Sequence, residues 1–218
     1  MAQVVRPYRG VSADDRRARR RAQLVEAGLD VLGADGLANT TMTAVCARAG
    51  LTERYFYESF GGRDELLIAI FDAFSAEATD AALAALAAAP PDLLARCRAA
   101  AGAIIDVLTG DPRKARAYVE AIGSEALRER RMETGRAYAA LLAHEMRELS
   151  GLSAKRHRAR LELATTVIIG GAAEAVVEWL DGGLALTREE LAEECARLCV
   201  AAAESIRASP AVGSPVRG

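Results

Sequence analysis

Apolar residues recur at helical spacing along most of the chain. Leu24, Ala27 and Val31 share one face of a helix that we expect to begin at about residue 12 or 14 and to reach residue 34. Alanine and leucine outnumber valine and isoleucine, and no segment shows the sustained alternation of a half-buried strand. The pattern therefore predicts an all-α protein.

Two short helices are expected after the first one. Side chains of residues 39–41 can cap a helix over residues 42–49, which Gly50 ends, and Thr52 can cap another that reaches about residue 60. Two short helices joined by a tight glycine-containing turn, behind a longer helix, form a helix-turn-helix unit.

From Arg63 onward the helical pattern resumes, and glycine, proline and capping residues mark its later boundaries. Asp111-Pro112 is a cap followed by proline at the first helical position, and Thr187-x-x-Glu190 is a capping box. We expect about nine helices in total.

The chain should divide into two folded domains with short ends. We expect a three-helix helix-turn-helix domain over residues 13–62 and a larger helical domain over residues 63–208. Residues 1–12 should form a disordered basic arm, and residues 209–218 a disordered tail.

Composition predicts a soluble, cytoplasmic protein with a buried core. Of the 218 residues, 51% are hydrophobic, yet no uncharged apolar run approaches the roughly 20 residues of a membrane-spanning helix, and the N-terminus has no signal-peptide core. The four cysteines, Cys46, Cys97, Cys195 and Cys199, are scattered, so we expect reduced core residues and no disulfide framework.

Charge is distributed unevenly along the chain. Up to Arg63 there are ten arginines and seven acidic residues, a net +3, whereas the remainder carries 18 basic and 23 acidic residues, a net −5. Seven of these arginines lie in the first 21 residues. For Arg6 and Arg9 a solvated tail is an open alternative, but Arg16 to Arg21, with Arg20 and Arg21 nearest the motif, are expected to contact phosphate.

The segment from Thr52 to Phe60 is the candidate recognition helix. Arg54 can donate a bidentate pair to guanine, Glu53 can accept from cytosine, and Tyr55 and Tyr57 can contact phosphate or thymine methyl groups. The alternative is an aromatic helix packed inside a bundle. The two tyrosines speak against it, because they lie about 100° to either side of Phe56 and cannot all be buried.

Residues 23–67 resemble the N-terminal domain of the TetR family of transcriptional regulators. The resemblance rests on a series of elements at the family's spacing: Gly36, Thr40-Thr41, Val45-Cys46, Ala49-Gly50-Leu51-Thr52, Tyr57-Glu58-Ser59-Phe60 and Arg63-Asp64-Glu65-Leu66. Gly28 and Cys46 replace the usual alanines, and Arg63 replaces the usual lysine but keeps its charge. The bulky Arg54-Tyr55 pair stands where small residues are common, so the operator sequence does not follow from the resemblance.

The resemblance also implies residue roles and partners. Thr41, Tyr57 and Arg63 would contact phosphate, and Thr52, Glu53, Arg54 and Tyr55 would contact bases or backbone. The family binds palindromic operator DNA as a homodimer, most often as a repressor, and releases it when a small-molecule effector binds.

Two late segments carry stripes of small and apolar residues that could pair in a four-helix dimer interface. Packing within one chain is the alternative, but both stripes are long and lie near the chain end. The expected interface residues are Ala164, Ile168, Gly171, Ala172, Ala175, Leu191, Cys195, Leu198 and Ala202.

An apolar effector pocket is expected in the second domain, where large side chains are sparse and line either a core or a cavity. The candidate lining residues are Phe71, Phe74, Ile105, Tyr118, Met132, Tyr138 and Trp179. A neutral or anionic apolar compound fits best, because no carboxylate cluster is evident.

Other functions have less support in the sequence. His144 and His157 stand alone, and no zinc helix, phosphate loop or nucleophile elbow is present, so we expect no catalytic residues, no metal and no cofactor. Cys195 and Cys199 share a helix face without a third ligand, which favours packing over metal binding. A bundle that binds a partner protein without DNA is the other alternative, and the basic arm argues against it.

Overall fold

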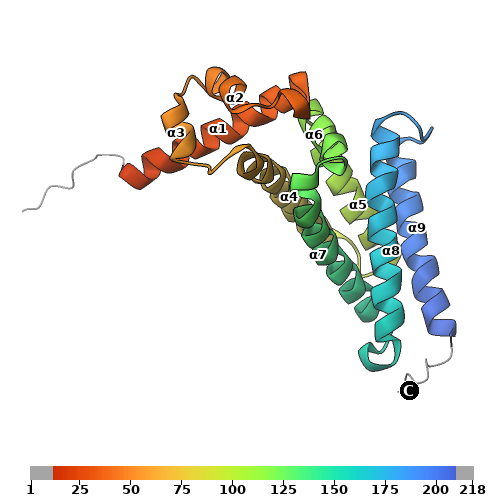
Figure 1. The fold of residues 1–218 in the computed structure, drawn as a ribbon. Helices are drawn as coiled ribbons and strands as arrows, with labels where there is room; N and C mark the ends of the chain where they lie inside the picture. Colours follow the sequence, from red (N-terminus) through yellow and green to blue (C-terminus); the bar gives the residue numbers. More distant parts are fainter. Residues whose placement is uncertain (1–11, 210–218) are drawn as a thin grey trace, which may run out of the picture.

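The computed structural model describes residues 12–209 and contains no strand in that range (Figure 1). The arm before Ser12, with Arg6 and Arg9, and the tail after Ser209 lie outside the described residues. The described part is all-α, as predicted, with nine α-helices and one 3₁₀ turn at Leu37–Asn39. The helices are α1 Ala13–Asp35, α2 Met42–Ala49, α3 Glu53–Tyr57, α4 Arg63–Ala88, α5 Leu93–Thr109, α6 Pro112–Ile122, α7 Glu125–Ser150, α8 Ala154–Leu180 and α9 Arg188–Ala208.

Capping residues define the helix ends. The predicted capping box at the start of α9 is present, because the Thr187 hydroxyl accepts from the Glu190 amide while the Glu190 carboxylate accepts from the Thr187 amide. The Asp111 side chain caps α6, where Pro112 occupies the first position. Gly50 ends α2 in the left-handed conformation, with φ of 64°. Local chemistry therefore sets these boundaries.

The helix α3 is shorter than the sequence pattern predicts. It ends at Tyr57, although the Phe60 amide still donates to the Phe56 carbonyl at 2.8 Å. The chain thus makes one further turn before the Gly61-Gly62 break. Phe56 and Phe60 are 0% and 1% exposed, with ring centroids 5.6 Å apart, and they anchor this turn in the core of the N-terminal domain.

The helix α4 connects the two ends of the molecule. Figure 1 shows α1 to α3 at one end and α8 beside α9 at the other, with α4 running between them. A first core continues from the N-terminal domain along α4, and a second, separate core lies between α7, α8 and α9 around Met146, Leu161 and Ala203. The helices α4 and α6 therefore contact α1 of the N-terminal domain as well as α5 and α7 of the larger domain.

The contact between α1 and α6 depends on a glycine. A Cβ atom on Gly33 would lie 2.7 Å from the Arg113 Cβ and 2.9 Å from its Cα, so a side chain there must push the two helices apart. We expect Gly33→Ala to lower the free energy of unfolding by roughly 1–3 kcal/mol, as measured by denaturant titration.

Gly135 supplies the matched control for that substitution. It lies inside α7, and a Cβ atom added to it would meet nothing within 4 Å, so Gly135→Ala should stabilise the protein by up to about 1 kcal/mol through helix propensity alone. Equal stability of Gly33→Ala and the wild type would show that α1 and α6 do not pack this closely.

Candidate nucleic-acid interface and effector cavity

The helix α3 presents polar side chains on one face and a buried aromatic on the other. The Arg54 side chain is 84% exposed and Tyr57 is 61% exposed, and Thr52 and Glu53 are also exposed. Phe56, on the opposite face of α3, is buried in the core of the N-terminal domain. This separation leaves the outer face of α3 open for contact with a macromolecule.

Two arginines of α1 hold α3 in place. The Arg20 guanidinium lies 4.5 Å from the centre of the Tyr55 ring and 3.5 Å from the Glu58 carboxylate. Arg21 donates to the Ser59 carbonyl at 2.6 Å and lies over the Phe60 ring. Both side chains therefore have a positioning role, in addition to the phosphate contact expected from the sequence.

Arg63 is likewise engaged within the chain. Its Nε donates to the Thr40 carbonyl at 2.7 Å, and its Nη2 donates to the Leu37 carbonyl. These bonds fix the segment that leads to Thr41, whose hydroxyl caps α2 by accepting from Ala44. The geometry points to an indirect effect of Arg63 on the surface of α2.

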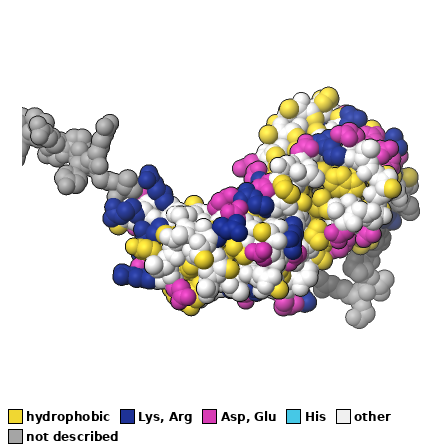
Figure 2. Space-filling model, turned by 90° about the horizontal axis from the view of Figure 1, so that it is seen from above, with side chains coloured by type: hydrophobic (Ala, Val, Ile, Leu, Met, Phe, Trp, Pro, Cys, Tyr) yellow, Lys and Arg dark blue, Asp and Glu magenta, His cyan; other side chains and the backbone are white. Residues whose placement is uncertain are grey.

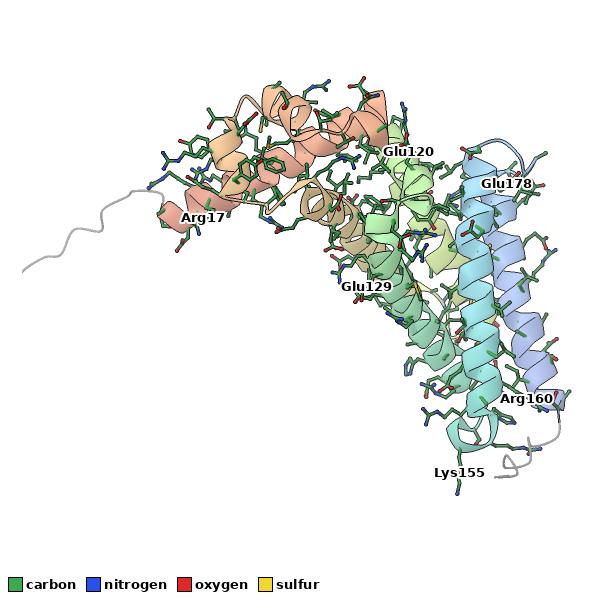
Figure 3. All side chains as sticks on the ribbon, in the orientation of Figure 1. Arg17, Glu120, Glu129, Lys155, Arg160 and Glu178 are labelled. Carbon is green, nitrogen blue, oxygen red and sulfur yellow. The ribbon has the colours of Figure 1, made fainter. Side chains whose placement is uncertain are left out.

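Basic side chains gather at the end of the molecule where α1 begins (Figure 2). Arg17 and Arg19 are exposed there, on the first turns of α1, and Figure 3 shows Arg17 at this end of the helix. The exposed face of α3 lies in the same domain. Together they form a positively charged surface beside a polar helix face.

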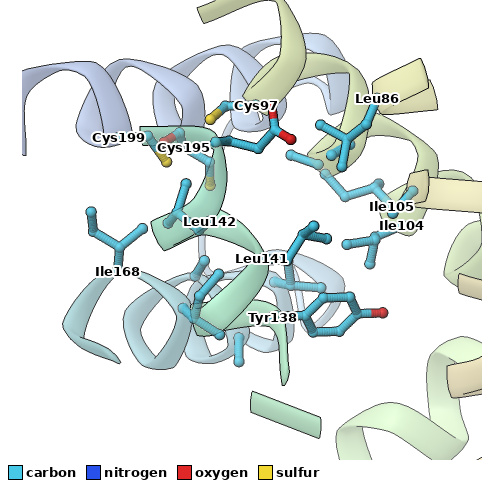
Figure 4. Close-up of a pocket in the computed structure, with 18 of the residues that line it drawn as sticks. Leu86, Cys97, Ile104, Ile105, Tyr138, Leu141, Leu142, Ile168, Cys195 and Cys199 are labelled. Atoms are coloured by element: carbon cyan, nitrogen blue, oxygen red, sulfur yellow. Dashed lines mark hydrogen bonds between the residues drawn. The ribbon is translucent and has the colours of Figure 1, made fainter. Parts of the chain in front are cut away.

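An apolar cavity lies inside the larger domain, with a volume of about 180 Å³ (Figure 4). Its walls come from α4 to α9 and are mostly alkyl groups, such as those of Ile104, Leu142 and Ile168. We call it the inner cavity. Six polar side chains also line it: Cys97, Tyr118, Tyr138, Glu145, Cys195 and Cys199.

A second cavity adjoins the inner one. This outer cavity, of about 440 Å³, shares five lining residues with the inner cavity, including Tyr118 and Tyr138, and is also lined by Arg128, Arg131 and Arg136. Burial raises the pKa of Tyr118 to about 12, so its hydroxyl stays protonated at neutral pH. The Tyr138 hydroxyl lies 3.0 Å from that of Thr79.

The structure places the predicted pocket residues in three groups. Ile105 lines the inner cavity, the two tyrosines line both cavities, and the outer cavity adds Phe71, Phe74 and Met132. Trp179 lines neither one. Its indole Nε1 donates to the Leu186 carbonyl at 2.7 Å, so this side chain closes the connection between α8 and α9.

Sequence reasoning missed the acidic residue and the thiols of the inner cavity. The Glu145 carboxylate accepts from Arg96 Nη1 at 2.8 Å and its side chain is 9% exposed. A glutamate on the same helix face as Leu142 and Met146 was the available signal. A hydrogen bond to Cys199, burial and the nearby carboxylate raise the pKa of Cys97 well above its usual range, so that thiol stays neutral.

The predicted dimer residues also divide into inner and outer positions. Leu198, 62% exposed, and Gly171 lie on the surface, and Ala164, Ala175 and Ala202 are half-buried. The others face their own chain: Leu191 is 3% exposed, and Ile168, Ala172 and Cys195 line the inner cavity.

Additional apolar residues extend the exposed part of this surface. Leu163 and Val167 on α8 are 66% and 64% exposed. By length and composition Lys155–Leu180 could cross a membrane, and only 11% of its most apolar window is buried. An apolar face of this kind on a two-helix edge also suits contact with another protein chain.

A network of charged side chains connects α6 to the N-terminal domain. Arg113 Nη1 donates to Glu26 at 2.7 Å and also to Asp30, both on α1, while its Nε and Nη2 pair with Asp111. Arg113 holds the pKa of Asp111 below its usual value. Glu120, labelled in Figure 3, accepts from the Leu37 amide. These bonds join α6 directly to α1 and to the turn that follows it.

Comparison with known proteins agrees with this geometry. Residues 24–70 match the sequence model of the bacterial regulatory proteins of the tetR family. None of the curated proteins matches the chain in sequence.

Solved structures share the fold over more than four fifths of the chain. A TetR-like transcriptional regulator from Rhodococcus sp. RHA1 is 21% identical, with a TM-score of 0.63 over 84% of this chain and 94% of that one. The fatty acid degradation regulator FadR from Bacillus halodurans is 19% identical, with a TM-score of 0.68 over 83% of this chain and 94% of that one. The multidrug binding protein EbrR, solved in complex with imidazole, is 20% identical, with a TM-score of 0.62 over 82% of this chain and 94% of that one.

Proposed function

We propose that the protein is a cytoplasmic transcriptional repressor of the TetR family of bacterial regulatory proteins, whose sequence model matches residues 24–70. It binds a palindromic operator as a homodimer, and a small apolar effector releases it. The observation that carries the proposal is the polar, exposed face of α3 above the buried Phe56. A helix-turn-helix places such a face in the major groove.

The proposed DNA contacts divide into base and phosphate contacts. Glu53, Arg54 and Tyr55 would approach base edges from α3, with Thr52 at its start. Thr41, Tyr57 and the basic residues of α1, including Arg20 and Arg21, would contact phosphates. Arg63 would support the phosphate contact of Thr41 indirectly, by holding the segment before α2 in place, since its guanidinium is already bonded to the carbonyl groups of Thr40 and Leu37.

The effector site is proposed to be the inner cavity, which the outer cavity adjoins. A mostly apolar cavity with few polar groups is the usual form of a small-molecule site. One structurally similar protein is described as a multidrug binding protein, which supports a site for small organic molecules in this fold. The protein would act by binding alone, without catalysis, metal or cofactor.

DNA binding is tested by gel shift with DNA from the promoter region of its own operon. If a dimer neutralises about six to ten phosphates, affinity should fall by roughly a thousandfold or more between about 50 and 200 mM salt. Arg54→Ala should reduce discrimination between operator and variant sites by about 1–3 kcal/mol. Arg63→Ala should weaken all sequences similarly.

The control for these variants is Arg98→Ala, an exposed arginine of α5 that pairs with Glu193 far from α3. It should bind DNA as the wild type does. A protein that shows no preference for any fragment of a genomic pool over random DNA would contradict the proposed function.

A further inference from the structure

A carboxylate inside an apolar cavity needs hydrogen-bond donors. The Glu145 side chain is 9% exposed, and among the described residues Arg96 is its one hydrogen-bond donor, through Oε2. Among the described residues its second oxygen, Oε1, has no such bond, and this oxygen is not one of the buried side-chain atoms without a partner, so it is still accessible. Because Glu145 lines the inner cavity, a ligand there is in a position to donate a hydrogen bond to this oxygen.

The size of the cavity limits the ligand. Its volume is about 180 Å³, and an apolar cavity of about 150 Å³ in another protein accepts benzene. The remaining walls are mostly alkyl groups, and the Cys97 thiol beside Glu145 is neutral. One ring of this size fits, with a single polar group directed at the carboxylate.

The charge balance limits the polar group. Arg96 already neutralises Glu145, so a neutral donor leaves the buried pair balanced. An anionic head group would instead meet the carboxylate, and a cationic one would leave an extra buried charge. The structure thus narrows the sequence expectation of a neutral or anionic compound to a neutral one.

We propose that the inner cavity selects a neutral molecule of one-ring size that carries a hydroxyl or N–H donor, and that Glu145 accepts the hydrogen bond from it. This assignment rests on the proposed effector function and adds the chemical class of the ligand. It makes Glu145 a specificity-determining residue.

The test uses three probes that share one ring: phenol, toluene and benzoate. Phenol and toluene have nearly the same size but differ in the donor, and benzoate carries the charge. In calorimetric titrations of the wild-type protein, phenol should bind roughly ten- to hundredfold more tightly than toluene, the range for a hydrogen bond to a charged group. Benzoate should bind more weakly than phenol.

The Glu145→Gln variant identifies the group responsible. It should reduce the preference for phenol over toluene to that of a neutral hydrogen bond, roughly two- to tenfold, while toluene affinity stays the same. Glu193→Gln is the matched control, because Glu193 also pairs with an arginine, Arg98, but lies outside the inner cavity. It should keep the full preference. Should Glu145→Gln fail to fold, the wild-type comparison of the three probes decides by itself.

Several outcomes would overturn the proposal. These are equal affinity for phenol and toluene, tighter binding of benzoate than phenol, no binding of any probe, or a Glu145→Gln variant that retains the preference. A parallel gel shift separates this question from the proposed function. Loss of specific DNA binding would refute the repressor assignment, whereas the probe titrations report on the cavity alone.

Discussion

Replacing Leu198 by glutamate should convert the protein from a dimer to a monomer. Leu198 is 62% exposed on α9, and Leu163 and Val167 on the neighbouring α8 are exposed to a similar degree. In the proposed dimer a partner chain covers these side chains. A carboxylate placed there would lose its hydration without a partner, which costs several kcal/mol, so the dissociation constant should rise by at least about a hundredfold.

Sedimentation velocity measures the change, and Leu83→Glu provides the control. Leu83 is a 46% exposed leucine of α4, away from α8 and α9, and its glutamate variant should remain dimeric. Because Leu198 is already exposed in the single chain, Leu198→Glu should keep its helical circular dichroism. A Leu198→Glu protein that sediments as a dimer would show that a different surface joins the subunits.

Val167 is a better second position than the small residues that the sequence indicated. Ala172 lines the inner cavity, so a glutamate there would disturb the cavity and would not report on the dimer alone. Val167→Glu should reproduce the effect of Leu198→Glu. Both variants should also lose most operator affinity, because a monomer spans one half-site only.

The sequence predicted the helices well because local chemistry determines their ends. The capping box at Thr187, the proline at the start of α6 and the left-handed Gly50 are properties of neighbouring residues. The end of α3 was placed too late, since Phe60 packs into the core from a turn after the helix. Tertiary packing determines where α3 ends, so the spacing of apolar residues along the sequence cannot predict this boundary.

The candidate site was less predictable, because it depends on which helix faces meet. The sequence indicated that Phe56 is buried and Arg54 exposed, since one helix fixes both directions. It could not show that Arg63 bonds to two carbonyl groups 23 and 26 residues away. Nor could it separate Ile105, which lines the inner cavity, from Trp179, which does not.

Replacing Arg113 by alanine should weaken the coupling between effector and operator while both still bind. The helix α6 carries Tyr118, which lines both cavities, and Arg113, which bonds to Glu26 and Asp30 of α1. The two side chains are five residues apart, about 7.5 Å along the helix. A ligand that shifts Tyr118 therefore moves the contact with the DNA-binding domain.

The expected effect is a change in coupling free energy. Allosteric coupling is typically about 1–3 kcal/mol, or roughly 5- to 150-fold in affinity, and a large part of it should be lost in Arg113→Ala. The helices α1 and α6 also pack closely at Gly33, independently of the ion pairs, so the Arg113→Ala variant should still fold. Gly33 would still hold the two helices close, which leaves some coupling in place.

Two titrations measure the coupling: effector binding with and without operator, and operator binding with and without effector. Linkage requires both to give the same factor, and that factor should fall severalfold in Arg113→Ala. The control is Arg130→Ala, because Arg130 pairs with Asp72 between α7 and α4 and makes no contact with α1. It should retain the wild-type factor. If Arg113→Ala also retained it, the ion pairs between α6 and α1 would have no part in transmission, and α4, which contacts both domains, would have to carry the signal.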